Sequence, residues 1–363
     1  MADQIPVGMR VDSTGPAFVR ARGLNRHTFW CGQSGSGKTY ALGVLLEQLL
    51  LRTKLPLVVL DPNSDFVRLH ELRDDADVEQ AAELSNRDIR VLHSRPGLGE
   101  DLKVRFLDMS EKARAALLQL DPIHDAEEFN ASLNLVAEAR AAGFPVHGTL
   151  VPWLRQSDIE SHRKLALRLE NLGIADWDLW AWEYEPVTSI IDERPDATVI
   201  DLGKFDTSLE PRIAALAVLD HLWERRHQRI GRLIVIDEAH NLCPPDPTTP
   251  VERLLVERIT QIAAEGRKYG LWLLLSTQRP SKVHPNVISQ CDNLALMRMN
   301  SPQDIEDLAH YFGYAPTELL RKASVFSQGQ SLLAGHFVAE PSIVRMGARL
   351  TCEGGSDIPV PLR

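Results

Sequence analysis

Residues 27–39 read HTFWCGQSGSGKT, and this stretch decides the fold class. Its last eight residues match the pattern G-x-x-x-x-G-K-[ST] in full. The apolar HTFWC before them has the character of a short strand, and residues 40–51 carry leucines at helical spacing. A glycine-rich loop between a strand and a helix directs backbone N–H groups at phosphate oxygens, and the helix N-terminus adds positive charge. The pattern therefore predicts a phosphate-binding loop rather than a chance glycine- and serine-rich turn.

The residue types in this loop indicate a nucleoside triphosphate with magnesium. Lys38 supplies a positive charge to the β- and γ-phosphates of ATP, and the Thr39 hydroxyl ligates Mg²⁺. We therefore expect nucleotide contacts from Gly32, Gln33, Ser34, Gly35, Ser36, Gly37, Lys38 and Thr39.

A second apolar run, residues 233–236, ends in an adjacent acidic pair. Asp237, at the end of a buried strand, is placed to hold Mg²⁺ through water, and Glu238 to orient or deprotonate the attacking water. This arrangement favours hydrolysis over phosphoryl transfer to a bound hydroxyl. The alternative interpretation is a charge pair that stabilises a helix N-terminus.

A third polar group follows the apolar run 271–275, which ends in Ser-Thr-Gln. The Gln278 amide can contact the γ-phosphate or the attacking water; a polar strand cap is the alternative.

Strands alternating with helices predict an α/β fold, in which helices cover both faces of a mostly parallel sheet. Further strands are expected at 19–24, 57–60, 89–93, 104–107, 198–202, 294–299, 331–338 and 343–346, and helices at 209–229, 251–269, 302–312 and over most of 110–174.

Composition limits the class of protein. The chain has 363 residues, 44% of them hydrophobic and 25% charged, with a formal net charge of −10. It contains no apolar stretch of the roughly 18–20 residues that a membrane span needs, no apparent secretory signal and no CxxC pair among its four cysteines. We therefore expect a cytoplasmic protein that has no membrane association of its own. The negative charge argues against coating nucleic acid with the whole surface but leaves a local basic channel possible.

These motifs together carry a family resemblance. The stretches LNRHTFWCGQSGSGKTYAL, LVVLDPNSDF, RLIVIDEAHNLCPP and EGRKYGLWLLLSTQRPSKVHPNVISQCDNLALMRMNSPQDIEDL resemble the HerA branch of the HerA–FtsK superfamily of P-loop ATPases. The resemblance implies a RecA-like ATPase. We expect its core at 1–70 and 196–350, a mostly helical insertion at 71–195 and a C-terminal tail at 351–363.

The resemblance also implies an assembly and further site residues. It implies a homo-hexameric ring that pumps double-stranded DNA for a partner nuclease or other effector. Asp61 is the acidic residue after the second strand and a possible Mg²⁺ ligand, Arg26 matches an arginine that acts on nucleotide in cis, and Arg267 matches the arginine finger offered to the neighbouring subunit. Arg298 is the second candidate for the finger, and a cation at a helix C-terminus is the alternative interpretation of Arg267.

One departure leaves other functions open. Only 31 residues precede Gly32, too few for the N-terminal β-barrel through which HerA proteins dock a nuclease. A scaffold ATPase that switches a partner enzyme, for example in phage defence, is therefore an alternative to the DNA motor. A conjugation- or secretion-type ATPase that depends on a membrane-bound partner is a third.

Overall fold

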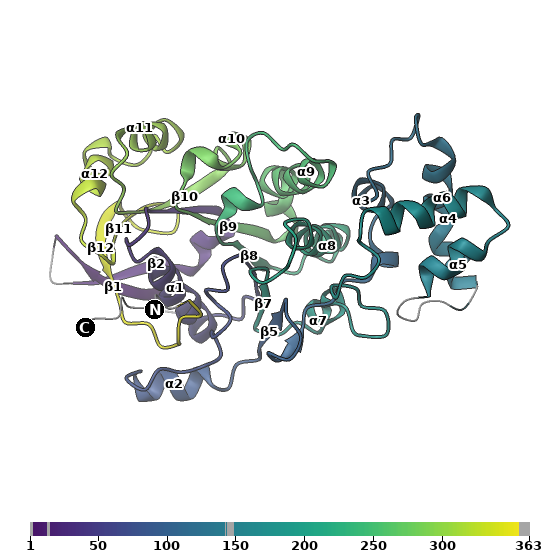
Figure 1. Ribbon diagram of the computed structural model, residues 1–363. Helices are drawn as coiled ribbons and strands as arrows, with labels where there is room; N and C mark the ends of the chain where they lie inside the picture. The colour runs from purple at the N-terminus through teal and green to yellow at the C-terminus, as the bar shows by residue number, and fades with distance from the viewer. Residues whose placement is uncertain (1–2, 13–14, 142, 144–148, 356–363) are drawn as a thin grey trace, which may run out of the picture.

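The computed structural model describes residues 3–12, 15–141, 143 and 149–355, and its centre is a 12-stranded sheet (Figure 1). The strand order is β2-β1-β12-β11-β10-β3-β9-β8-β4-β7-β5-β6. In chain order the strands are β1 (Gln4–Arg10), β2 (Pro16–Arg20), β3 (His27–Cys31), β4 (Leu57–Asp61), β5 (Ile89–His93), β6 (Glu100–Asp101), β7 (Ala197–Asp201), β8 (Arg232–Ile236), β9 (Leu271–Thr277), β10 (Cys291–Met297), β11 (Gln330–Gly335) and β12 (Ser342–Met346).

Strand direction divides the sheet into two parts. Neighbouring strands from β10 through β3, β9, β8, β4, β7 and β5 to β6 are parallel. Strands β11, β12, β1 and β2 continue the sheet with antiparallel pairing. Because the parallel strands share one direction, their carboxyl ends meet at one edge of the sheet and their amino ends at the other.

Helices cover both faces, as the alternation of strand and helix predicts. Phe29, Val58 and Ile234 pack on one face with the apolar residues of α8 and α9, whereas Trp30 and Val59 pack on the other with those of α1. The helices are α1 (Lys38–Arg52), α2 (Val78–Leu84), α3 (Glu111–Leu117), α4 (Ala126–Ala141), α5 (Leu150–Gln156), α6 (Glu160–Asn171), α7 (Val187–Glu193), α8 (Glu210–Glu224), α9 (Pro250–Glu265), α10 (Pro285–Ile288), α11 (Pro302–Tyr311) and α12 (Thr317–Arg321).

Two expected segments differ from the structure, and one strand was not expected. Residues 104–107 form no ladder strand: Val104 makes an isolated bridge to Trp180, and a 3-10 helix runs over Phe106–Asp108. Short apolar runs are ambiguous by pattern alone, and here Phe106 packs edge-on against the Trp180 ring. The edge strand expected at 19–24 ends at Arg20 and is followed by a 3-10 helix, Ala21–Asn25, while β1 was not expected.

The range expected as a mostly helical insertion, 71–195, also contributes to the sheet. Strands β5 and β6 lie inside it and extend the parallel part beyond β7. Figure 1 shows α4, α5 and α6 grouped in a lobe at the end of the molecule away from β1 and β2. The helical lobe therefore follows a further piece of sheet rather than starting where β4 ends.

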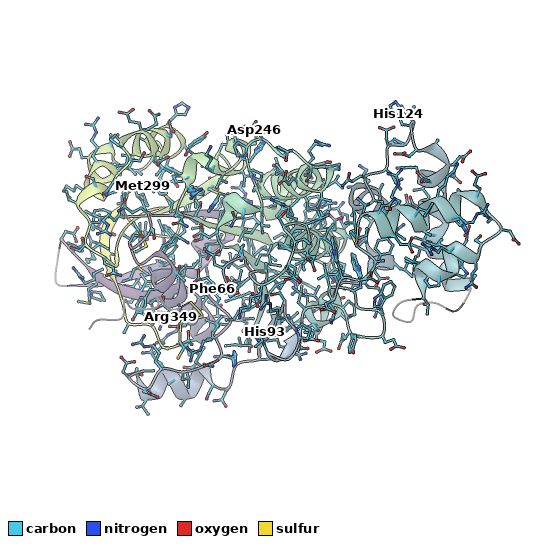
Figure 2. All side chains as sticks on the ribbon, viewed as in Figure 1. Phe66, His93, His124, Asp246, Met299 and Arg349 are labelled. Carbon is cyan, nitrogen blue, oxygen red and sulfur yellow. The ribbon has the colours of Figure 1, made fainter. Side chains whose placement is uncertain are left out.

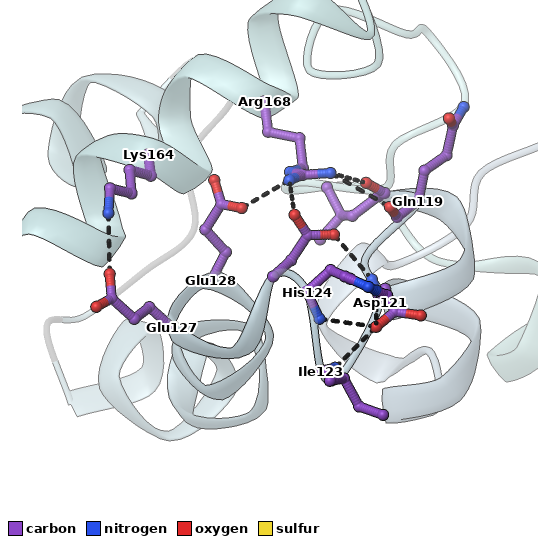
Figure 3. A network of polar contacts seen from close by, with 10 residues as sticks. Gln119, Asp121, Ile123, His124, Glu127, Glu128, Lys164 and Arg168 are labelled. Carbon is purple, nitrogen blue, oxygen red and sulfur yellow. Dashed lines mark hydrogen bonds and ion pairs between the residues drawn. The ribbon is translucent and has the colours of Figure 1, made fainter.

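Paired charges stabilise this lobe (Figure 3). Arg168 of α6 lies 2.8 Å from Asp125 and 2.6 Å from Glu128, and it also donates to the Leu118 and Gln119 carbonyl oxygens at 3.4 and 3.2 Å. One guanidinium therefore ties α6 to α4 and to the end of α3.

Trp177 and Trp180 stack with ring centroids 5.6 Å apart, and Trp180 is buried, which assigns this cluster to packing.

The last described residues fold back onto α1 and the loop after β4 instead of leaving the domain as a tail. The buried Glu47 carboxylate of α1 accepts hydrogen bonds from the N–H groups of Leu350 and Thr351 at 2.8 and 3.0 Å. The Arg349 guanidinium, fully buried, lies over the Phe66 ring at 5.6 Å, and Figure 2 labels both side chains. Residues 356–363 of the expected tail lie outside the described part of the chain.

Candidate nucleotide and cation site

The chemistry-bearing residues gather at the carboxyl edge of the parallel sheet. The glycine-rich loop follows β3, and Ser276 and Thr277 end β9, its neighbour. Asp237 follows β8, and Asp61 ends β4. Since these strands are adjacent in the order β3-β9-β8-β4, residues up to 238 positions apart in sequence meet in one place.

Contacts with neighbouring segments hold the loop at residues 32–37 in a curled conformation. Gly35 and Gly37 have φ values of +72° and +83°, which side chains rarely adopt. A Cβ on Gly32 would lie 2.7 Å from the Met297 Cβ. The Gln33 N–H donates to the Arg298 carbonyl oxygen at 2.9 Å, and the Ser36 carbonyl accepts from Gly329 at 2.9 Å. The β10 and β11 segments therefore fix the cradle that a phosphate would enter.

Lys38 points from the first turn of α1 into the acidic groups of β8. Its Nζ lies 2.9 Å from Asp237 Oδ1, 3.1 Å from Glu238 Oε1 and 2.9 Å from Ser276 Oγ, and the residue is 7% exposed. Burial lowers the pKa of Lys38, but the charges of Asp237 and Glu238 outweigh it and raise the pKa above its usual value. The ammonium is therefore charged, and a phosphate group would be a third anionic partner for it.

Glu238 occupies a strained position and is ionised. Its φ of +41° is unusual for a residue with a side chain. Burial would raise its pKa, but the hydrogen bond from His240 and the charge of Lys38 hold the pKa of Glu238 at about 2. The His240 Nδ1 lies 3.2 Å from Glu238 Oε2 and 3.0 Å from Thr277 Oγ1. Movement of Lys38 toward a phosphate would remove one cause of the low pKa and make Glu238 a better proton acceptor.

Three carboxylates form a second acidic group beside Lys38. Oxygen atoms of Asp61, Asp65 and Asp237 all lie within 4.8 Å of one another. Burial and then the charge of Asp237 raise the pKa of Asp61 to about 8, and the same two causes raise that of Asp65 to about 6. In the described part of the chain, Asp237 Oδ2 is buried without a hydrogen-bond partner. Crowded carboxylates with an unsatisfied buried oxygen fit a divalent cation, which takes oxygen ligands.

The remaining predicted residues on this edge are near the site. Thr39 is half-buried in the first turn of α1, and Gln278 is half-buried just beyond β9. The Gln278 backbone N–H lies 3.5 Å from Glu238 Oε2. Arg298 directly follows β10 and contacts the loop, where its Nη2 donates to the Gly35 carbonyl oxygen at 3.0 Å.

The structure does not bring Arg26 and Arg267 to this edge. Arg26 precedes β3 and Arg267 precedes β9, so both lie at the amino edge of the sheet. There the carboxylate of Asp292 pairs with Arg267 and lies 3.7 Å from Arg26 Nη1. The five residues of β3 lie between Arg26 and Gly32, a span of about 20 Å along the extended strand, so Arg26 does not reach the phosphate loop of its own chain.

Sequence reasoning missed Asp65, His240 and Ser276. Each of the three lies at or just after the carboxyl end of β4, β8 or β9, where neighbouring residues were already predicted to be functional. That position in the sequence was the signal that could have identified them. Asp65 comes four residues after Asp61, whose carboxylate accepts the Asp65 N–H at 3.0 Å.

A family model described as "Helicase HerA, central domain" matches residues 5–216, more than half of the chain. The chain belongs to the HerA family. HerA, a DNA double-strand break repair helicase, from Pyrococcus furiosus is 20% identical over 369 residues, covering 89% of this chain and 65% of the relative. HerA from Sulfurisphaera tokodaii is 28% identical over 156 residues, covering 41% of this chain and 31% of the relative. The chain thus spans less than two thirds of the length of these two HerA proteins.

Solved structures share the fold. VirB4 of Thermoanaerobacter pseudethanolicus aligns with a TM-score of 0.62 and 15% identity, covering 95% of this chain and 96% of that one. The conjugative coupling protein TrwB aligns with a TM-score of 0.63 and 14% identity, covering 97% of this chain and 91% of that one. The HerA family match and the phosphate-loop site together identify an ATPase. Among the described residues, no helix is long and apolar enough to cross a membrane.

Proposed function

We propose that this HerA-family chain is an ATP-hydrolysing ring motor that translocates double-stranded DNA. The observation that carries the proposal is the division of the site between two edges of one sheet. The carboxyl edge holds the phosphate loop, the acidic pair Asp237 and Glu238, and the cluster of three aspartates. The two arginines expected to assist hydrolysis lie at the amino edge. A second copy of the chain in a ring would bring one edge against the other.

Each carboxyl-edge residue has a role that its position supports. The loop 32–37 and Lys38 would hold the phosphates of ATP. TrwB, which shares the fold, has been solved in complex with the non-hydrolysable GTP analogue GDPNP. Thr39 and Asp237, with Asp61, would hold Mg²⁺, which supplies charge neutralisation for the phosphates. Glu238 orients the attacking water and accepts its proton, and Gln278 reports the nucleotide state from the end of β9.

The arginines act on a neighbouring subunit in this proposal. Arg267 and Arg26 have 40% and 37% of their side chains exposed, so a partner's phosphate can reach them. A fixed guanidinium stabilises charge that develops on a transferring phosphoryl group. A homo-hexamer closed head to tail would complete each site with the next subunit's arginines. Such a motor would work in the cytoplasm, where ATP and DNA are present, and serve a partner nuclease or effector.

The test is the ATPase rate with and without long linear duplex DNA, on protein whose oligomeric state is measured by mass photometry. A hexamer whose hydrolysis is stimulated by duplex, less so at higher salt, is the expected result. The Glu238→Gln protein, purified identically, gives the background rate. A hexamer that ignores duplex but responds to a co-purifying protein would overturn the motor proposal in favour of a scaffold ATPase.

A further inference from the structure

The loop after β4 folds back onto the carboxylate that ends the strand. The N–H groups of Asp65 and Phe66 donate to Asp61 Oδ1 and Oδ2 at 3.0 and 2.7 Å. Ser64, just before them, has a φ of +60°, so the loop turns sharply at a residue other than glycine. A side chain in this strained conformation needs contacts that hold it there.

Asp201 supplies one of those contacts. It ends β7, the neighbour of β4, and is fully buried. Its Oδ1 accepts the Ser64 Oγ–H at 2.7 Å and the Gly203 N–H at 3.0 Å. A Cβ on Gly203 would lie 2.4 Å from Ser64 Oγ, so this position leaves room for glycine only. The mechanism proposed above makes no use of this buried carboxylate.

The returning C-terminal segment holds the loop from the other side. The Gly354 N–H donates to the Asp65 carbonyl oxygen at 3.0 Å, and a Cβ on Gly354 would lie 2.0 Å from the Ser64 carbonyl oxygen. The hydrogen bonds to Asp65 from both sides therefore use its backbone. Its carboxylate lies with those of Asp61 and Asp237, near the buried Oδ2 of Asp237 that has no hydrogen-bond partner within the described residues.

We propose that Asp65 is a further residue of the cation and nucleotide site and that Asp201 positions it through Ser64. This inference rests on the proposed function, because it assigns a role at the same site. The Asp65 carboxylate adds negative charge beside Asp237 where Mg²⁺ would bind with its nucleotide. The Ser64–Asp201 hydrogen bond fixes the turn from which that carboxylate projects, and so links β7 to the cation site.

The experiment measures binding, not turnover. The affinity of the full chain for a fluorescent ADP analogue is titrated over a series of free Mg²⁺ concentrations. We expect Asp65→Asn to raise the Mg²⁺ concentration for half-maximal tight binding by about tenfold. Ser64→Gly tolerates the positive φ and removes the side chain that carries the hydroxyl, and it should give about a threefold shift in the same direction. Asp74→Asn, an exposed site with the same charge change, is the control and should give no shift.

Coupling separates positioning from a general loss of structure. If Ser64 and Asp201 act through Asp65, adding Ser64→Gly or Asp201→Asn to Asp65→Asn produces no further shift. The inference is overturned if the double variants show the product of the two single shifts in Mg²⁺ requirement, or if Asp65→Asn leaves that requirement unchanged. The proposed function still stands in either case, provided that the wild type binds nucleotide in a Mg²⁺-dependent way. A wild-type chain that binds no nucleotide at any Mg²⁺ concentration overturns both.

Discussion

The two edges of the parallel sheet carry charge in opposite ways. At the carboxyl edge Lys38 is 7% exposed and shared between buried carboxylates, Glu238 is strained, and Asp61 has a pKa of about 8. At the amino edge Arg267 and Arg26 are 40% and 37% exposed and share a carboxylate that is itself 34% exposed. Buried ionisable groups with shifted pKa values are typical of a ligand-binding site. Exposed ion pairs contribute little stability, so their members can exchange partners readily. The contrast indicates a prepared ligand site at the carboxyl edge, and the proposed function makes the amino edge the source of arginines for a neighbouring subunit.

The largest effect that tests this contrast comes from the carboxyl edge. Lys38→Ala removes the buried cation that faces Asp237 and Glu238 and that would face phosphate. We expect kcat/KM for ATP to fall by at least about 1,000-fold, because the charge is needed both for binding and for the transition state. The measurement is steady-state hydrolysis together with titration of a fluorescent nucleotide.

A fold control is needed because the same change leaves two buried carboxylates without their cation. Lys54→Ala, an exposed position beyond the end of α1, should leave both hydrolysis and nucleotide affinity unchanged. A Lys38→Ala protein that melts like the wild type and still hydrolyses ATP at the normal rate would show that the carboxyl edge is not the nucleotide site.

The carboxyl edge could be predicted from sequence because its residues end strands. Apolar runs of four or five residues that stop at a polar side chain mark the ends of buried parallel strands, and in a parallel sheet those ends converge. The ends of β4 and β8 were placed in this way, as was the loop after β3. The His240 contact to Glu238 was not predicted, since His240 lies four residues beyond the strand, where a side chain can turn either way.

The amino edge could not be placed in this way. A residue just before a strand and a residue just after it are neighbours in sequence but lie a full strand length apart in space. The order of motifs along the chain does not reveal this distance. Arg26 is close to the phosphate loop in sequence but about 20 Å away along β3. Strand β1 escaped prediction because Pro6 and Gly8 interrupt the alternation, and a register shift between these two residues accommodates them.

The second test joins the two edges. Arg267→Ala should leave nucleotide affinity unchanged and lower kcat of the assembled protein by about 100-fold, because the guanidinium acts only when a neighbour's phosphate lies beside it. Lys268→Ala, the adjacent exposed cation, is the matched control and should hydrolyse normally. Mass photometry on both variants shows whether assembly is retained.

Mixing distinguishes action in trans from action in cis. Glu238→Gln keeps its arginines but lacks the carboxylate that orients water, so mixed rings contain interfaces where an intact Glu238 meets an intact Arg267. Partial recovery of hydrolysis on mixing the two inactive variants is expected. If mixtures stay as inactive as either parent while mixed rings form, Arg267 belongs to its own subunit or to the fold.

The smallest effect concerns Asp292, which pairs with Arg267 and lies near Arg26. Asp292→Asn removes the charge but keeps the shape, and it should change the free energy of unfolding by less than about 1 kcal/mol because the pair is exposed. If Arg267 acts on a neighbouring subunit, as proposed, it exchanges the Asp292 carboxylate for a phosphate when the ring assembles. Removing the competitor should therefore raise kcat without DNA by up to about threefold, an effect of about 0.6 kcal/mol on the exchange.

Salt gives an internal check on that explanation. Exposed ion pairs are screened at high ionic strength, with a Debye length of about 3 Å at 1 M. The difference between wild type and Asp292→Asn should therefore shrink as salt is added, whereas Asp246→Asn, an exposed site with the same charge change, should match the wild type throughout. A fall in kcat that persists at high salt would instead mean that Asp292 holds Arg267 in its working position, and the amino edge would then be as prepared as the carboxyl edge.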